Sequence, residues 1–183
     1  MKDSLTIDKK ILIKAQNGDL ESFEYILTFY EKAIFNYCLR VIKNLSDTED
    51  IIQETFIKVY TNRRSIDPEK NIKTWIFTIA TNTMYDYFRK KKRKNERILN
   101  QEDETIIDPS AYYNSEGLTS DIDSALNKIN KEYKEAILLF YQQGFEYKEI
   151  AETLSIPINT IKTHISRGRE QLREILKNEY GKN

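Results

Sequence analysis

The segment from Asn71 to Lys94, NIKTWIFTIATNTMYDYFRKKKRK, most constrains the fold because its two faces and its charged end need three different environments. One face at helical spacing is apolar and predicts burial in a helical core: Ile72, Ile76, Ile79, Ala80 and Tyr87. The other face mixes hydroxyls with rings: Thr74, Phe77, Thr78, Thr81, Tyr85 and Phe88. It leads into six consecutive cations, Arg89 to Lys94. Such a face suits unstacked bases and phosphates, and the alternative is that a second helix covers the rings while the cations are a solvated helix end.

Five Gly and three Pro among 183 residues favour long helices, so we predict an all-α fold. No apolar run reaches membrane-spanning length and the first twenty residues are polar, so we expect neither a signal peptide nor an anchor. Cys38 is the only cysteine, so no internal disulfide can form. This fits a reduced compartment, and we expect a cytoplasmic protein.

Charge is distributed unevenly along the chain, although the net charge is zero. Residues 1–94 hold 18 basic and 13 acidic side chains, whereas residues 95–124 hold 1 and 8. The stretch 95–120 contains Asp108-Pro109 and Gly117 and has no sustained apolar period, which is typical of a linker. We therefore predict two small helical domains, residues 1–94 and 121–183, joined by an acidic linker over residues 95–120.

The front domain is predicted to contain helices over 8–16, 20–42 and 47–60, with Ser46 or Asp47 capping the third, followed by a loop over 61–70. The helix over 20–42 has apolar residues around most of its circumference and should be the buried spine. The helix over 47–60 places Ile57 among charged residues on its outward face: Asp47, Asp50, Glu54 and Lys58. An outward Ile beside carboxylates suggests a docking face, and a solvated face with one stray Ile is the alternative.

The C-terminal part is predicted to form helices over 121–129, 131–142 and 146–153, a turn over 154–157 and a last helix to about 176. Two helices across a four-residue turn form a helix-turn-helix pattern, although plain bundles also contain it. Ile158, Ile161 and Ile165 share the buried side of the last helix, so Asn159, Thr163 and other polar residues point outward. Asn and Arg side chains can contact base edges in the major groove, and Arg169 is better placed for phosphate.

No cluster of residues predicts catalysis. His164 is the only histidine and has no Cys or carboxylate at ligand spacing, so we expect a surface or phosphate-contacting side chain. Glycine-rich phosphate loops, zinc-protease helices and nucleophile elbows are absent from the sequence. We therefore expect no catalytic residue, metal site, cofactor or small-molecule substrate.

Three ordered motifs carry a family resemblance: DTEDIIQETFIKVY, KTWIFTIATNTMYDYFRKKKR and FEYKEIAETLSIPINTIKTHISRGREQLRE. Together they resemble the extracytoplasmic-function (ECF) group of bacterial RNA polymerase sigma factors, with sigma-two and sigma-four domains, over nearly the whole chain. The resemblance implies a protein that binds core RNA polymerase, directs it to specific promoters and assists promoter opening in transcription initiation. It implies core polymerase, through the clamp helices of its largest subunit and its flap, as one partner and promoter DNA as another. It further implies an anti-sigma factor, frequently membrane-bound.

The resemblance also implies roles for individual residues. Polymerase binding would fall to Asp47, Asp50, Gln53, Glu54 and Ile57. The loop over 61–70 would hold a flipped base, and contacts to the minus-ten element would come from Arg63, Arg64, Thr78, Thr81, Asn82, Tyr85, Arg89, Lys90, Lys92 and Arg93. The minus-thirty-five element would be contacted as duplex by Asn159, Thr160, Lys162, Thr163, Ser166, Arg167 and Arg169.

Energetics limit what so small a protein can do alone. Opening about ten base-pair steps costs on the order of 14 kcal/mol. Capturing two or three bases on aromatic rings returns only about 2 to 9 kcal/mol. We therefore expect DNA opening only together with core polymerase.

The chain departs from the family pattern at several positions, which leaves its preferred base sequence open. Asn130-Lys131 replaces a frequent Pro pair, and Pro157 stands where Ser is usual. His164 and Gly168 replace a common basic residue and Ala. Two other classes of protein stay open: an ordinary helix-turn-helix regulator whose front half binds a partner or ligand, and a cytoplasmic enzyme with an unrecognised site.

Overall fold

The computed structural model describes residues 7–97 and 118–180, and every regular element in these two ranges is a helix. The first group comprises α1 (Lys9–Gln16), α2 (Leu20–Ile42), α3 (Leu45–Thr61), a short 3-10 helix (Arg63–Ser65) and α4 (Ile72–Arg97). The second group comprises α5 (Leu118–Lys128), α6 (Lys131–Ile137), a π-helical turn (Leu138–Gln142), α7 (Tyr147–Leu154) and α8 (Ile158–Tyr180). The predicted all-α fold is confirmed, and none of the described helices is long and apolar enough to span a membrane.

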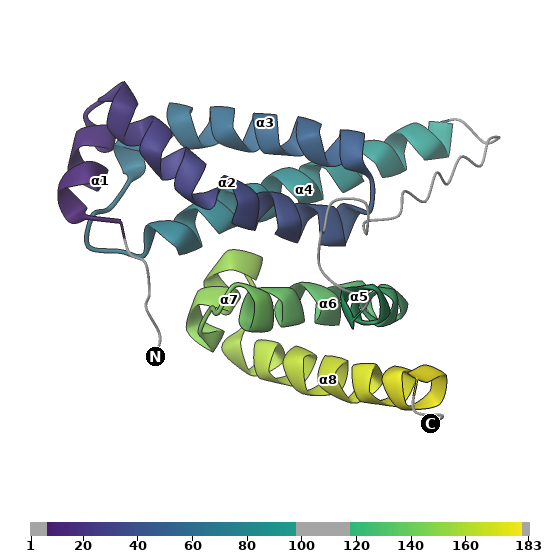
Figure 1. The fold of residues 1–183 in the computed structure, drawn as a ribbon. Coiled ribbons are helices and arrows are strands. Elements are labelled where there is room, and N and C mark those ends of the chain that lie inside the picture. Colours follow the sequence, from purple (N-terminus) through teal and green to yellow (C-terminus); the bar gives the residue numbers. More distant parts are fainter. Residues whose placement is uncertain (1–6, 98–117, 181–183) are drawn as a thin grey trace.

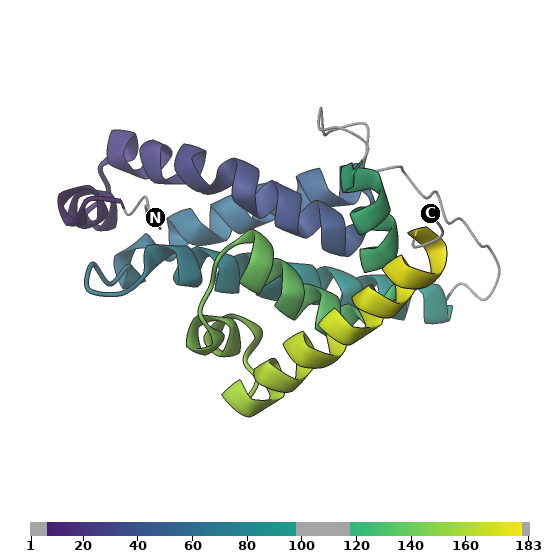
Figure 2. The same ribbon diagram turned by 60° about the horizontal axis from the view of Figure 1, so that its bottom comes forward.

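The two groups of helices lie against each other as two layers (Figure 1). The α1–α4 group forms the upper layer in that view, with α3 on the side away from the α5–α8 group. The second group packs against the first chiefly where α7 lies on α4, with a smaller contact between α6 and α2. Figure 2 shows α8 running across the outer side of the second group. Helix α4 is therefore covered from above by α2 and α3 and from below by α7.

Local signals in the sequence explain most helix boundaries. Asp8 caps α1 by accepting a hydrogen bond from the backbone N of Lys10, and Asp19 caps α2 in the same way through Ser22. The predicted range of α2 is confirmed. The predicted cap of α3 was wrong: Asn44 is the N-cap and accepts from the backbone N of Asp47.

Helices extend into both ends of the stretch that the sequence predicts to be a linker. Helix α4 continues to Arg97 and α5 begins at Leu118, three residues inside each predicted boundary of 95 and 120. The cations at the end of α4 explain its extension, since Lys and Arg are good helix formers. The rest of the predicted linker, residues 98–117, lies outside the described residues.

Each group of helices has its own buried apolar residues. In the first group they include Ile26, Ile34 and Tyr37 of α2, Ile51 and Val59 of α3, and Ile76 and Met84 of α4. In the second group Leu139, Ile150, Ile161 and Ile165 close the helix-turn-helix, as their spacing predicts. Phe77 of α4 and Phe145 before α7 are both buried and join the two sets, with ring centroids 5.1 Å apart in an edge-to-face arrangement.

Burial of a lysine accompanies the packing of the two layers. Lys134 of α6 is 4% exposed, and its Nζ donates to Asn127 Oδ1 at 2.8 Å. Burial lowers the pKa of Lys134 to about 7, and the nearby cations Lys43 and Arg40 of α2 act in the same direction. The sequence pattern does not indicate this burial, because a lysine on an amphipathic helix is usually exposed.

Replacement of Gly168 tests the contact between α6 and α8. A Cβ at this position would lie 2.6 Å from Ile137 Cδ1 and 2.9 Å from Tyr133 Cβ. We expect Gly168→Ala to lower the free energy of unfolding by about 1 kcal/mol, since overpacking costs about 1–3 kcal/mol and the higher helix propensity of Ala returns up to about 1. The measurement is chemical denaturation. Asn178→Ala, at an exposed position of the same helix, is the control and should not destabilise the protein.

Lys134→Met tests the effect of the buried lysine through pH. The pKa of Lys134 is lower in the folded state than in the unfolded state, so folding releases a proton between pH 7 and about 10.5, and this residue penalises stability most below pH 7. We expect Lys134→Met to raise the thermal unfolding midpoint, and to do so more at pH 6 than at pH 9. An equal gain at the two pH values would show that the buried amine is not the cause.

Candidate nucleic-acid interface

One face of α3 is exposed on the side away from the α5–α8 group (Figure 1). Asp50 and Gln53 are exposed on it, and Ile57 is 64% exposed. Glu54 is half-buried, and Asp47 accepts hydrogen bonds from Tyr87 Oη and from Lys91 Nζ of α4. The structure therefore brings the five predicted polymerase-binding residues together on one helix, with an apolar side chain at the end of an acidic strip.

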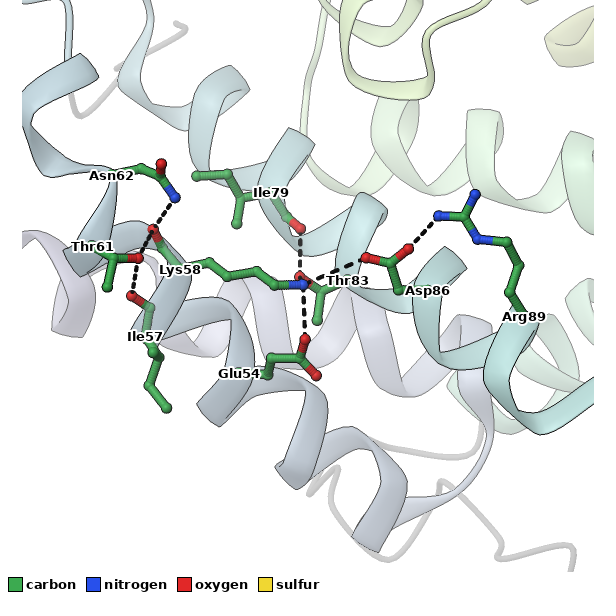
Figure 3. A network of polar contacts seen from close by, with 9 residues as sticks. All are labelled: Glu54, Ile57, Lys58, Thr61, Asn62, Ile79, Thr83, Asp86 and Arg89. Carbon is green, nitrogen blue, oxygen red and sulfur yellow. Dashed lines mark hydrogen bonds and ion pairs between the residues drawn. The ribbon is translucent and has the colours of Figure 1, made fainter. Parts of the chain in front are cut away.

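Lys58 connects this face of α3 to α4 (Figure 3). Its Nζ lies 2.8 Å from Glu54 Oε1, 3.2 Å from Thr83 Oγ1 and 3.6 Å from Asp86 Oδ2. Asp86 also pairs with Arg89, and these cations hold the pKa of the Asp86 carboxyl below its usual range. The outward position of Lys58 follows from the sequence pattern, but this network does not, because Thr83 and Asp86 lie on another helix.

The loop before α4 presents two arginines in different environments. Arg63 donates to the carbonyl oxygen of Tyr60 at 3.0 Å, and its guanidinium lies 4.3 Å from the centroid of the Tyr60 ring. Arg64 is exposed. A cavity beside this loop is lined by residues of the loop, of the start of α4 and of α7, among them Lys70, Trp75 and Glu149.

The predicted exposure of hydroxyls and rings on one face of α4 is wrong for three of them in this arrangement. Thr74 is 4% exposed, and Phe77 and Thr81 are fully buried. Thr81 Oγ1 lies 3.5 Å from Tyr37 Oη of α2, while Phe77 lies between Tyr37 and Phe145. The alternative stated for these rings, cover by a further helix, is what the structure shows for Phe77, which Tyr37 of α2 and Phe145 of the second group cover together.

Two more rings on this face contact α6. Tyr85 Oη donates to Glu135 Oε2 at 2.7 Å, and Lys131 Nζ lies 3.4 Å from the centroid of the Phe88 ring. Burial raises the pKa of the Glu135 carboxyl, and burial followed by the charge of Glu135 raises that of the Tyr85 hydroxyl. Tyr85 therefore stays a protonated donor at neutral pH.

The exposed part of the predicted minus-ten surface on α4 comprises Asn82 near its middle and the cations towards its end. Asn82 is exposed, and Thr78 is half-buried and donates to the carbonyl oxygen of Thr74 within its own helix. The predicted cations at the helix end are exposed: Arg89, Lys90, Lys92 and Arg93. The sequence predicted that these rings and cations act together. In this arrangement they differ in exposure, because the rings contact other helices and the cations face solvent.

The polar face of α8 points to solvent. The exposed residues are Asn159, Lys162, Thr163, Ser166, Arg167 and Arg169, and Thr160 is half-buried. Ile161 and Ile165 are buried on the opposite side against the rest of the second group. This arrangement presents donors and acceptors at the start of the second helix of a helix-turn-helix, where such motifs contact base edges.

His164 differs from the expectation of a surface side chain. Its side chain is 13% exposed and its ring lies 5.2 Å from that of Tyr133 of α6, between centroids. The His164 side chain, on the flank of α8, is largely buried because α6 packs against that flank. Within residues 7–97 and 118–180, no three His, Cys, Asp or Glu side chains are grouped to hold a metal ion.

Comparisons with known proteins agree with this geometry. Family models match the chain as Sigma-70 region 2 over residues 27–94 and as Sigma-70, region 4 over residues 119–172. The chain is 34% identical to the ECF RNA polymerase sigma factor SigW of Bacillus subtilis, over 92% of this chain and 96% of that protein. It is 29% identical to the ECF RNA polymerase sigma-E factor of Haemophilus influenzae, over 94% and 96%.

Solved structures give the same assignment. The sigma factor RpoE of Bartonella quintana, solved in complex with the anti-sigma factor NepR, is 31% identical to this chain and has a TM-score of 0.76. The match covers 87% of this chain and 99% of that one. CnrH, solved in complex with the cytosolic domain of CnrY, has a TM-score of 0.69 at 20% identity over 94% and 98%, which shows a shared fold. The two sigma-70 regions, their order and the full-length identity together show that the chain belongs to the ECF group of RNA polymerase sigma factors.

Proposed function

We propose that this sigma factor, which directs core RNA polymerase to promoters, divides that work among three surfaces. The exposed face of α3 binds core polymerase, the loop after α3 together with α4 contacts the minus-ten element, and α8 contacts the minus-thirty-five element. Residues 1–94 form the first functional unit and residues 121–183 the second. The protein acts in the cytoplasm and has no catalytic activity of its own.

The observation that carries this proposal is the exposed polar face of α8 above a closed helix-turn-helix core. Asn159 and Arg167 offer bidentate hydrogen bonds to adenine and guanine edges, and Thr163 offers a methyl group for thymine. All three side chains are exposed. Lys162 and Arg169 extend the face with cations suited to phosphate.

The α3 face supports a docking role because an apolar residue is exposed beside acidic ones. Ile57 is 64% exposed, whereas Thr55 and Val59, two positions away on the opposite side of the helix, are buried. A large apolar side chain in a charged surround is typical of a contact point in an interface. The position of this face, away from α5–α8, leaves it accessible while the two groups of helices are packed together.

The minus-ten surface combines the arginines of the loop with Asn82 and the cations at the end of α4. Contacts of these cations with the phosphate backbone would position a DNA strand, and the rings of α4 would stack on its unpaired bases. The cost of opening the duplex exceeds what such stacking returns, so the free energy for opening must come largely from core polymerase.

An anti-sigma factor is a further proposed partner. The RpoE relative at 31% identity was solved bound to one. We propose that a protein of this kind also holds the present chain inactive, and that it is membrane-bound. An affinity pull-down with the tagged chain from its own cells tests this, and recovery of no such inhibitor would contradict it.

Ile57→Ala tests the docking face. Because Ile57 is exposed, the free energy of unfolding should change by no more than about 0.5 kcal/mol. Loss of a central apolar contact should weaken binding to purified core polymerase about tenfold, and run-off transcription should fall in parallel. Ile13→Ala, at another exposed Ile on α1, is the matched control. Equal affinities for the two variants would remove α3 from the proposal.

Substitutions on α8 test how the minus-thirty-five element is contacted. We expect Asn159→Ala to lose about 1–3 kcal/mol of discrimination at one base pair, because it removes a bidentate contact. Arg169→Ala should instead weaken binding uniformly across sequences and reduce the slope of log affinity against log salt by about 1. Fluorescence anisotropy with duplexes mutated one position at a time measures both effects. A uniform loss from Asn159→Ala would assign that residue to the backbone.

A further inference from the structure

Tyr133 of α6 lies against the flank of α8 that borders its outward face. The centroid of its ring is 5.2 Å from that of the His164 ring. Its Cβ would lie only 2.9 Å from a Cβ placed at Gly168. His164 and Gly168 are four positions apart and therefore share one side of the helix. Arg167 directly precedes Gly168 and is exposed, so Tyr133 reaches α8 next to a residue proposed to contact base edges.

Packing fixes the position of Tyr133 relative to α8. Because Gly168 has no side chain, the backbone of α8 approaches both Tyr133 and Ile137 of α6 directly. Glu132, the residue before Tyr133, adds a further contact, since its Oε2 lies 3.9 Å from Nε2 of His164. The base of the Tyr133 side chain is therefore held by contacts that do not involve Arg167.

The hydroxyl oxygen of Tyr133 accepts a hydrogen bond from the guanidinium of Arg167. This bond raises the pKa of Arg167 above its usual range. An arginine is charged at neutral pH in any case, so the bond matters for geometry rather than for charge. The guanidinium is planar and carries five N–H donors in a fixed arrangement. A bond from one of them to a fixed oxygen orients the plane and leaves the remaining donors for other acceptors.

An oriented guanidinium can contact a base edge at a lower cost in entropy. A bidentate contact to guanine uses two N–H groups, which must face O6 and N7 together. An exposed arginine otherwise samples many rotamers, and ordering it on binding costs free energy. Holding Arg167 before DNA binds removes part of this cost for a base whose acceptors match its orientation. A base that offers its acceptors elsewhere gains nothing from it.

We propose that Tyr133 is a positioning residue for base contacts by Arg167, so that α6 sets part of the sequence preference of α8. This inference rests on the proposed function of α8. Tyr133 belongs to none of the three proposed surfaces. The base preference at one position of the minus-thirty-five element therefore depends on a residue outside the polar face of α8, through a single hydroxyl group.

Tyr133→Phe tests this inference, because it removes the hydroxyl and keeps the ring against His164 and Gly168. The full chain is incubated with a pool of randomised DNA duplexes, and sequencing of the bound fraction gives the base preference at each position. The position that loses its preference in Arg167→Ala is the one that Arg167 contacts. We expect Tyr133→Phe to lower the preference at that position about fivefold. The preference at the position that Asn159 contacts should stay unchanged.

Tyr25→Phe is the matched control, because it removes a hydroxyl from a side chain of α2 that is 51% exposed, and it should leave every preference unchanged. A loss spread over all positions in Tyr133→Phe would assign the hydroxyl to the stability of the helix-turn-helix or to a phosphate contact, and would overturn the inference. An unchanged preference at the Arg167 position would overturn it as well.

A double-mutant cycle separates failure of this inference from failure of the proposed function. Tyr133→Phe should have no further effect in the Arg167→Ala background, because its hydroxyl acts through that side chain. Additive losses from the two substitutions would overturn the inference alone. A wild-type chain that selects no sequence from the pool, or an Arg167→Ala chain that keeps every preference, would overturn the proposed role of this face of α8 and the inference with it.

Discussion

Packing on two sides of α4 is the constraint on which the rest of the structure depends. One side buries Ile76, Ala80 and Met84 against α2 and α3, and it holds the first group of helices together. The other side buries Thr74 and Phe77 against α7. A surface that is occupied by protein cannot bind a nucleic-acid strand at the same time. The arrangement of the two groups of helices therefore decides whether this face of α4 can act.

The two contacts of α4 differ in composition. This difference makes it physically reasonable that the second group of helices separates from α4 while α2 and α3 stay packed on it. The contact with α2 and α3 has buried apolar side chains such as Ile76, Ala80 and Met84 at its centre, with polar contacts of Lys58 and Asp47 at its more exposed edge. The contact with the second group mixes one pair of rings, Phe77 and Phe145, with charged and hydroxyl partners such as Glu135 and Glu149. Polar partners can exchange their hydrogen bonds for bonds to water or nucleic acid, whereas an apolar core has no such substitute. Packing between domains within one chain commonly has this mixed character.

The faces proposed for polymerase binding and for strand capture lie on different sides of one small bundle. The α3 face lies away from the covered face of α4, but Lys58 joins them through Glu54 on one side and Thr83 and Asp86 on the other (Figure 3). A change in the position of α3 on docking would thus be transmitted directly to α4 through this network. The α8 face is independent of both, because its residues project from the outer side of the second group.

The sequence by itself determined the helices, the helix-turn-helix and the outward faces of α3 and α8, since the spacing of apolar residues is a property of each helix alone. The three motifs in order were also sufficient for the family. The sequence did not determine what lies on the second face of α4, nor the burial of Lys134 and His164. Periodicity shows which residues share a face but not what covers it. The partners of Tyr85 and Asn71 lie 50 and 78 positions further along the chain, so only the tertiary structure could bring them together.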